Sequence, residues 1–159
     1  MNNLPEDHQK YYKAFCNTQP NQIECMSRKV SSWKFGDSDK MAEELLNSVL
    51  SGAKTATSGL VISQEYYKES LPEVGERSII LDGKNAPRCI IETTKVLIIP
   101  YHEVDEDYAL KEGEGFTSLK DWQVAHHAFF TRECKRMNTQ FDENMKVVCE
   151  EFKVIYSSS

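Results

Sequence analysis

The chain has 159 residues, of which 40% are hydrophobic and 28% are charged, and its formal net charge is −6. These values are ordinary for one globular domain, and the negative charge argues against broad, non-specific attraction to nucleic acid. It still permits a small basic pocket for one nucleotide or for a single-stranded segment. No stretch approaches the roughly 20 apolar residues of a membrane helix, and no secretory signal is visible. We therefore expect neither a membrane nor DNA as a partner.

The cysteines favour a reducing compartment. They are odd in number and widely spread, and no Cys-x-x-Cys pair is present, so we expect neither a zinc site nor a redox couple of that kind. We predict free thiols and a cytoplasmic location. The five positions are Cys16, Cys25, Cys89, Cys134 and Cys149.

The N-terminal part is predicted to be helical before a first short strand. Aromatic residues among polar ones between positions 5 and 17 indicate a helix, and the polar run 17–21 ends it. Alternation at residues 33–36 then predicts a short strand.

The strongest helical pattern covers residues 38 to about 50. Asp37 or Ser38 can cap its start, and Gly52 can close its end. The apolar residues at helical spacing are Met41, Leu45, Leu46, Val49 and Leu50.

The remainder of the chain reads as strands with inserted helices. Such an order of elements predicts a small mixed barrel or a curved sheet. The expected elements are strands at 78–81, 88–99 and 146–156, a hairpin-type turn at 82–87, and helices at 105–111 and 118–137.

The spacing of Lys54 and Thr57 is the most informative local feature. If residues 54–57 form a strand, the two side chains point to opposite faces, whereas a bend after Gly52 would let both reach one cavity. A lysine near a hydroxyl can act as a base once burial favours its neutral form, or can bind phosphate as a cation. The structural alternative is a solvated lysine that complements the dipole of the preceding helix.

Several acidic and histidine residues are weaker candidates. Glu92 and Glu150 fall among apolar residues on predicted strands, where a carboxylate needs a partner unless that face is solvated. His126 follows Trp122 by one helical turn and is expected to be a packed histidine, and the pair with His127 points two ways. We expect no metal and no cofactor, because the chain has no phosphate loop, dinucleotide fingerprint, zinc-protease motif or nucleophile elbow.

Glu112 and Glu114 flank Gly113 in a loop that contains two glycines. Glycine permits a sharp bend, which would let one carboxylate turn towards a site while the other stays in water. A plain solvated loop is the structural alternative.

In chain order, these segments resemble the ASCH superfamily, in its longer bacterial type. The resemblance covers about residues 33–156 and implies an α+β fold, with a PUA-like small β-barrel, flanking helices and a cleft suited to RNA or a small modified nucleoside. We therefore assign 31–159 to an ASCH domain and 1–30 to an N-terminal helical extension. The segments that carry the resemblance are 33–36, 52–57, 71–76, 87–96, 109–115, 118–122, 126–130 and 147–152.

The resemblance also implies catalytic residues. Small members similar to the N4-acetylcytidine amidohydrolase use a lysine, a threonine and a glutamate, which by motif match fall on Lys54, Thr57 and Glu112, or on Glu114 instead. Thr57 would attack the amide carbonyl, Lys54 would take its proton, and the glutamate would orient the lysine or transfer protons. A buried glutamate partner would, however, favour the charged form of the lysine.

Two other functions remain open. One is metal-independent cleavage of single-stranded RNA, in which Lys54 would stabilise the charge of the phosphorane, and the other is a non-catalytic module that binds RNA or a nucleotide. Trp33, Phe35, Tyr66 and Tyr67 could stack on a base, with core packing as the alternative role.

The chain departs from the family pattern at two positions. Phe116 stands where the longer type usually has an aspartate, and Gln123 stands where a basic residue is common. If those polar groups contact substrate, we expect a different affinity or substrate choice here.

Overall fold

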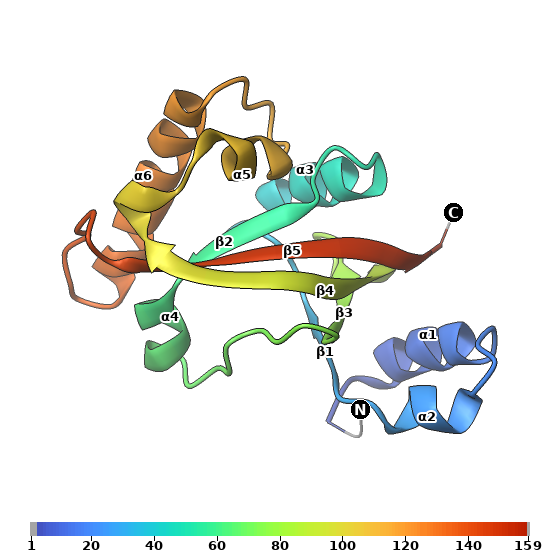
Figure 1. The fold of residues 1–159 in the computed structure, drawn as a ribbon. Coiled ribbons are helices and arrows are strands. Elements are labelled where there is room, and N and C mark those ends of the chain that lie inside the picture. Colours follow the sequence, from blue (N-terminus) through green and yellow to red (C-terminus); the bar gives the residue numbers. More distant parts are fainter. Residues whose placement is uncertain (1–2, 159) are drawn as a thin grey trace. The chain divides into compact units, whose positions relative to one another are not determined.

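The computed structural model describes residues 3–158 as an α+β fold on one five-stranded sheet (Figure 1). The strand order is β1-β3-β4-β5-β2, where β1 pairs parallel with β3, while β3–β4 and β2–β5 are antiparallel pairs. The predicted α+β class is confirmed. The sheet is not closed into the expected barrel. Closure would require its two edge strands, β1 and β2, to pair with each other, and they are not neighbours in the strand order. The strands are β1 Val30–Trp33, β2 Ala56–Leu60, β3 Arg77–Leu81, β4 Pro87–Pro100 and β5 Lys146–Ser157.

The chain divides into two compact units. Unit 1 comprises Met1–Gly52, Gly75–Thr93 and Phe152–Ser159, and unit 2 comprises Ala53–Val74 and Thr94–Glu151. No helix within residues 3–158 combines the length and the apolar character needed to cross a bilayer.

The helices of unit 1 within residues 3–158 are α1 (Glu6–Cys16), α2 (Gln22–Ser27) and α3 (Asp39–Leu50). The expected helix at 38–50 is confirmed, and Ser38 caps it by accepting a hydrogen bond from the backbone of Met41 (3.1 Å). β1 ends at Trp33, so the strand predicted at 33–36 lies three residues too late. Two apolar clusters form the core of this unit, one between α1, α2 and the sheet and one beneath α3.

The cysteine prediction is wrong for one pair. Cys16 at the end of α1 and Cys25 in α2 form a disulfide, so the two helices are covalently joined. The run 17–21 between them turns the chain and allows the two helices to pack together, which spacing alone did not indicate. Cys89, Cys134 and Cys149 are free, as predicted, and they are buried, where a thiol packs as a small hydrophobe.

Unit 2 carries α4 (Val61–Tyr66), the short 3₁₀ helix η1 (Tyr101–Glu103), α5 (Glu106–Lys111) and α6 (Leu119–Arg136). The expected helices at 105–111 and 118–137 are confirmed, with Asp105 and Ser118 as their capping residues. The core packs α6 and the 101–109 segment against β2 and β5. Its buried members are Leu60, Tyr101, Val104, Ala109, Trp122, Phe130, Cys134, Met137, Val147 and Cys149.

The two carboxylates expected on strands have different surroundings. Glu92 is an ion-paired carboxylate, 3.6 Å from Arg28 Nη1 and 3.9 Å from Lys153 Nζ, which confirms the structural interpretation. Glu150 is buried in β5, opposite Thr57 of β2.

Candidate active site

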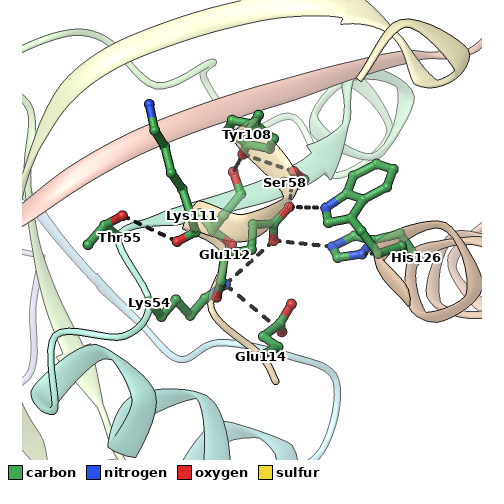
Figure 2. Close-up of polar contacts among 10 residues, drawn as sticks. Lys54, Thr55, Ser58, Tyr108, Lys111, Glu112, Glu114 and His126 are labelled. Carbon is green, nitrogen blue, oxygen red and sulfur yellow. Dashed lines mark hydrogen bonds and ion pairs between the residues drawn. The ribbon is translucent and has the colours of Figure 1, made fainter. Parts of the chain in front are cut away.

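Unit 2 buries a lysine and a glutamate against each other. Lys54 lies just before β2 and is 2% exposed, while Glu112 follows α5 as its C-cap and is 1% exposed. Figure 2 shows both side chains converging with those of Glu114 and His126. Three separate segments thus contribute to one cluster of charges: the segment before β2, the loop after α5, and α6.

The backbone brings these segments together through a glycine contact. Thr55 donates its backbone N–H (2.8 Å) and its hydroxyl (3.2 Å) to the carbonyl of Lys111, which fixes the chain beside Lys54 to the end of α5. Gly113 has φ +64°, and a Cβ built there would collide with the carbonyl of Ala53 and lie 2.8 Å from the backbone nitrogen of Lys54. Glycine is therefore required both for the left-handed turn and for the close approach.

The carboxylate of Glu112 accepts four hydrogen bonds. Its Oε1 accepts from His126 Nε2 (3.2 Å) and from Lys54 Nζ (3.5 Å). Its Oε2 accepts from Ser58 Oγ (2.6 Å) and from Trp122 Nε1 (2.5 Å). A carboxylate offers about four lone-pair positions, so Glu112 is saturated and has none left for a substrate.

Glu112 and His126 each favour the charged form of the other. Burial alone would raise the pKa of Glu112, but the neighbouring charges of His126 and Lys54 lower it to about 2. Burial opposes the charged form of His126, but Glu112 raises its pKa above the ordinary value. His126 Nδ1 also contacts the carbonyl of Trp122 at 3.0 Å. Since a carbonyl and a carboxylate only accept, both ring nitrogens must donate, and His126 is an imidazolium.

Glu114 differs from Glu112 in having capacity to spare. Its Oε1 lies 3.9 Å from Lys54 Nζ, its side chain is 20% exposed, and its buried Oε2 has no hydrogen-bond partner among residues 3–158. Burial raises the pKa of Glu114, Lys54 lowers it, and the Glu112 carboxylate raises it, with a net upward shift. A carboxyl with a raised pKa and an open oxygen is suited to proton transfer near neutral pH.

Ser58, and not Thr57, presents its hydroxyl to Glu112. Side chains alternate along β2, so Thr57 points to the opposite face, which it shares with its cross-strand partner Glu150. The backbone carbonyl of Thr57 accepts a hydrogen bond from the Tyr108 hydroxyl (2.6 Å), which also lies 2.9 Å from Ser58 Oγ. The structure thus brings together Lys54, Glu112 and Glu114 of the predicted residues, and turns the Thr57 side chain away from the Ser58 face.

The predicted aromatic contacts lie elsewhere. Trp33 and Phe35 belong to unit 1, where their rings pack edge-to-face with centroids 4.7 Å apart and Phe35 is buried in the core. Tyr66 is at the end of α4, is 53% exposed and packs edge-to-face on Tyr67 (5.0 Å). Phe116 packs edge-to-face on the ring of His126 (5.8 Å).

Three side chains have the donor types and spacing of a metal site. Donor atoms of Glu112, Glu114 and His126 all lie within 4.8 Å of one another. The Lys54 ammonium lies within 4 Å of both carboxylates, so a metal ion would have to compete with a cation that the chain itself supplies. The donor set fits a divalent ion in type, but its Glu112 oxygens are already committed to four donors.

Comparison with known proteins gives the family. The model of the ASCH domain matches residues 31–156. The chain belongs to this family. An ASCH domain from Lactobacillus crispatus JV V101 is 32% identical over 97% of each chain with a TM-score of 0.89, and protein EF3133 from Enterococcus faecalis V583 is 36% identical with a TM-score of 0.81. The second match covers 93% of this chain and 90% of the other.

The predicted membership of the ASCH superfamily is thereby confirmed, and with it the PUA-like class, a class of RNA-binding folds. A further match is a piece of the alanine–tRNA ligase of Sulfurisphaera tokodaii, 32% identical over 74 residues. That match covers 43% of this ASCH domain protein and only 8% of the ligase.

Sequence reasoning missed three members of the cluster, namely Ser58, Tyr108 and the donating Trp122. The spacing of Trp122 and His126 gave a signal, because residues four apart share one helix face, and their rings do stack with centroids 4.3 Å apart. The expectation of a packed histidine was thus confirmed, but its bond to Glu112 was not foreseen. Ser58 and Tyr108 gave no signal, since their contact depends on the pairing of β2 with β5.

Proposed function

We propose that this ASCH domain binds a modified nucleoside, free or within single-stranded RNA, and hydrolyses an acyl amide on its base, as in N4-acetylcytidine. The observation that carries the proposal is that the two glutamates beside Lys54 differ in charge state and in free hydrogen-bonding capacity. Glu112 is saturated and charged, whereas Glu114 has an open oxygen and a raised pKa. One carboxylate orients the lysine, and the other remains available for protons.

The reaction follows from these positions. Water attacks the acyl carbon, Glu114 accepts the proton of the water, and the oxyanion develops beside the Lys54 ammonium. The C–N bond then breaks, and Glu114 returns the proton to the exocyclic amine, which releases cytidine and acetic acid. The acid then loses its remaining proton to water as acetate. In this scheme Lys54 stabilises the oxyanion and is not the base, because its Nζ already donates to Glu112 and lies 3.9 Å from Glu114.

The charge balance of the site favours an amide over a phosphodiester. Lys54 and His126 carry positive charges, but Glu112 contacts both, and the chain as a whole has a net charge of −6. Binding to a nucleic-acid backbone gains its affinity from cations that neutralise phosphates. A neutral carbonyl needs only one hydrogen-bond donor beside the oxygen on which negative charge develops, and Lys54 can provide it.

The test uses N4-acetylcytidine and measures release of cytidine by chromatography. Wild type is expected to release cytidine, and Glu114→Gln to lose roughly 100-fold or more of the rate, a typical contribution of general acid–base catalysis. Thr57→Val should stay within a few-fold of wild type, because its hydroxyl lies on the other face of β2. Conversely, if a folded Thr57→Val protein lost turnover, the nucleophile would be the hydroxyl of Thr57 and not a water molecule.

Wild type that releases no cytidine while circular dichroism shows a folded protein would contradict amide hydrolysis. A labelled single-stranded RNA, with and without EDTA, then separates the two remaining functions. Cleavage products would establish a ribonuclease, and salt-sensitive binding without products would establish a binding module. Glu112→Gln serves as a structural comparison, because it alters the cluster without touching the proposed proton carrier.

A further inference from the structure

Unit 1 places a guanidinium beside the disulfide. Arg77 Nη1 lies 3.5 Å from Cys25 Sγ and 3.3 Å from the hydroxyl of Tyr12. That hydroxyl in turn lies 3.6 Å from the same sulfur and donates to the carbonyl of Cys25 (3.0 Å). A neutral disulfide sulfur is a weak acceptor and needs no cation.

Arg77 has no carboxylate partner among residues 3–158. Its Nε is buried without a hydrogen bond, and its remaining contact is with the ring of Phe15, whose centroid lies 5.3 Å from the guanidinium carbon. Its cross-strand partner is Glu92, and that carboxylate pairs with Arg28 and Lys153. If the disulfide were reduced, a thiolate on Cys25 would lie next to the Arg77 guanidinium and could form an ion pair with it.

We propose that Cys16 and Cys25 form a reversible thiol–disulfide couple with low-molecular-weight thiols, in which Arg77 stabilises the reduced state by pairing with the thiolate of Cys25. The principle is general: a group that stabilises the thiolate makes a disulfide easier to reduce. This inference is independent of the proposed amide hydrolysis, since all its residues lie in unit 1.

The exchange balances as two displacements. The thiolate of the small thiol attacks Cys16 Sγ, the disulfide bond breaks, and its electron pair leaves on Cys25 as a thiolate beside Arg77. A second small thiolate attacks the reagent sulfur of the mixed disulfide and releases Cys16, which takes up a proton. Two small thiols are thereby oxidised to their disulfide, and the protein disulfide gains two electrons.

Access to the sulfurs requires local opening of α2. Both cysteines are buried, but α2 has only six residues, of which Cys25 alone is buried. A helix of this length is not stable by itself, and short exposed elements open at a small fraction of the global unfolding cost. Reduction removes the covalent link of α2 to α1, so the state of the couple determines how firmly this helix is held.

The test equilibrates the whole protein in buffers of reduced and oxidised glutathione at pH 7, then traps thiols by alkylation and identifies them by peptide mass. The Cys16–Cys25 pair of wild type should titrate reversibly. Arg77→Met should remain oxidised at glutathione ratios that reduce wild type, with the exchange constant shifted by roughly 10-fold, equivalent to about 30 mV. Arg77→Lys keeps the charge and should shift less.

A second measurement needs no variant. In the reduced protein Cys25 should alkylate at a lower pH than an ordinary thiol, whereas Cys89 and Cys149 serve as internal controls, because burial raises the pKa of each to about 12. Two results would overturn the proposal: an exchange constant that is the same in wild type and Arg77→Met, or a Cys25 that reacts no faster than the two buried controls.

Discussion

Each unit of the molecule holds a cation away from bulk water, and the two cations have different partners. In unit 2, Lys54 lies within 4 Å of Glu112 and Glu114, and Glu112 is further bound by three other donors. In unit 1, the half-buried Arg77 contacts a tyrosine hydroxyl, an aromatic ring and a disulfide sulfur. The first cation is fully compensated, and the second has no anion among the described residues.

The two cations therefore differ in role: Lys54 stabilises the fold through its carboxylate partners, whereas Arg77 has no carboxylate partner among the described residues and can still pair with an anion. Buried pairs are costly to break, because removing one partner leaves the other charge unpaired in a low dielectric. An uncompensated cation can be removed without leaving an orphaned anion. The comparison thus predicts a large loss of stability for one substitution and a small loss for the other, although the two are apparently similar.

The largest expected effect is on the compensated side. Lys54→Met should lower the free energy of unfolding by about 3–5 kcal/mol, the usual cost of breaking a buried ion pair. Arg77→Met should cost about 1 kcal/mol, equivalent to one hydrogen bond, since its chain can still pack against Phe15. Urea unfolding of both variants measures the difference. Equal losses would show that Arg77 has an anionic partner in solution, and would remove the contrast.

The second effect concerns the glycine that lets α5 approach Lys54. Gly113→Ala should cost roughly 2–3 kcal/mol, because a side chain at φ +64° is strained and its Cβ meets the Ala53 carbonyl. Gly115→Ala is the matched control, with φ +78° but no atom within 4 Å of an added Cβ. The control should cost only the conformational strain, about 1 kcal/mol. Urea unfolding of the two variants measures these losses of stability. Identical losses for Gly113→Ala and Gly115→Ala would contradict the close approach of Gly113 to the Ala53 carbonyl.

Much of the fold was predictable because its signals are local. The helices at 38–50 and 118–137 each combine apolar spacing with a serine at the start, and in the structure Ser38 and Ser118 cap these helices. β4 and β5 are long and rich in β-branched residues, and they were found to within two residues. The strand β2 reads Ala-Thr-Ser-Gly-Leu and gives no clear period, since its conformation depends on pairing with β5.

The site was predictable only in part, for the same reason. Family resemblance selected Lys54 and Glu112, and the structure brings them together. The roles of Ser58 and Thr57 depend on which face of β2 each occupies, and a shift of one residue would exchange them. The disulfide likewise depends on the packing of α1 on α2, which no spacing of cysteines encodes.

The smallest expected effect is a dependence of stability on pH in the Glu112 cluster. The folded-state pKa of His126 is raised by Glu112, so its contribution is fully present below the ordinary pKa and is lost as pH rises through the raised value. The pKa of Glu112 is lowered to about 2, so its contribution is present above about pH 4.5 and is lost as pH falls towards 2. Together they predict greatest stability between about pH 4.5 and 6.5.

The neighbouring histidine provides the control for that profile. His126→Gln should flatten the decline on the alkaline side, because the group that loses its proton there is gone, while the acid limb from Glu112 persists. His127 is exposed on the adjacent position of α6, and His127→Gln should leave both limbs as in wild type. Unfolding free energies measured at intervals from pH 3 to 9 test this. An unchanged alkaline limb in His126→Gln would mean that His126 is neutral in the folded protein, and that Lys54 alone compensates the charge of Glu112.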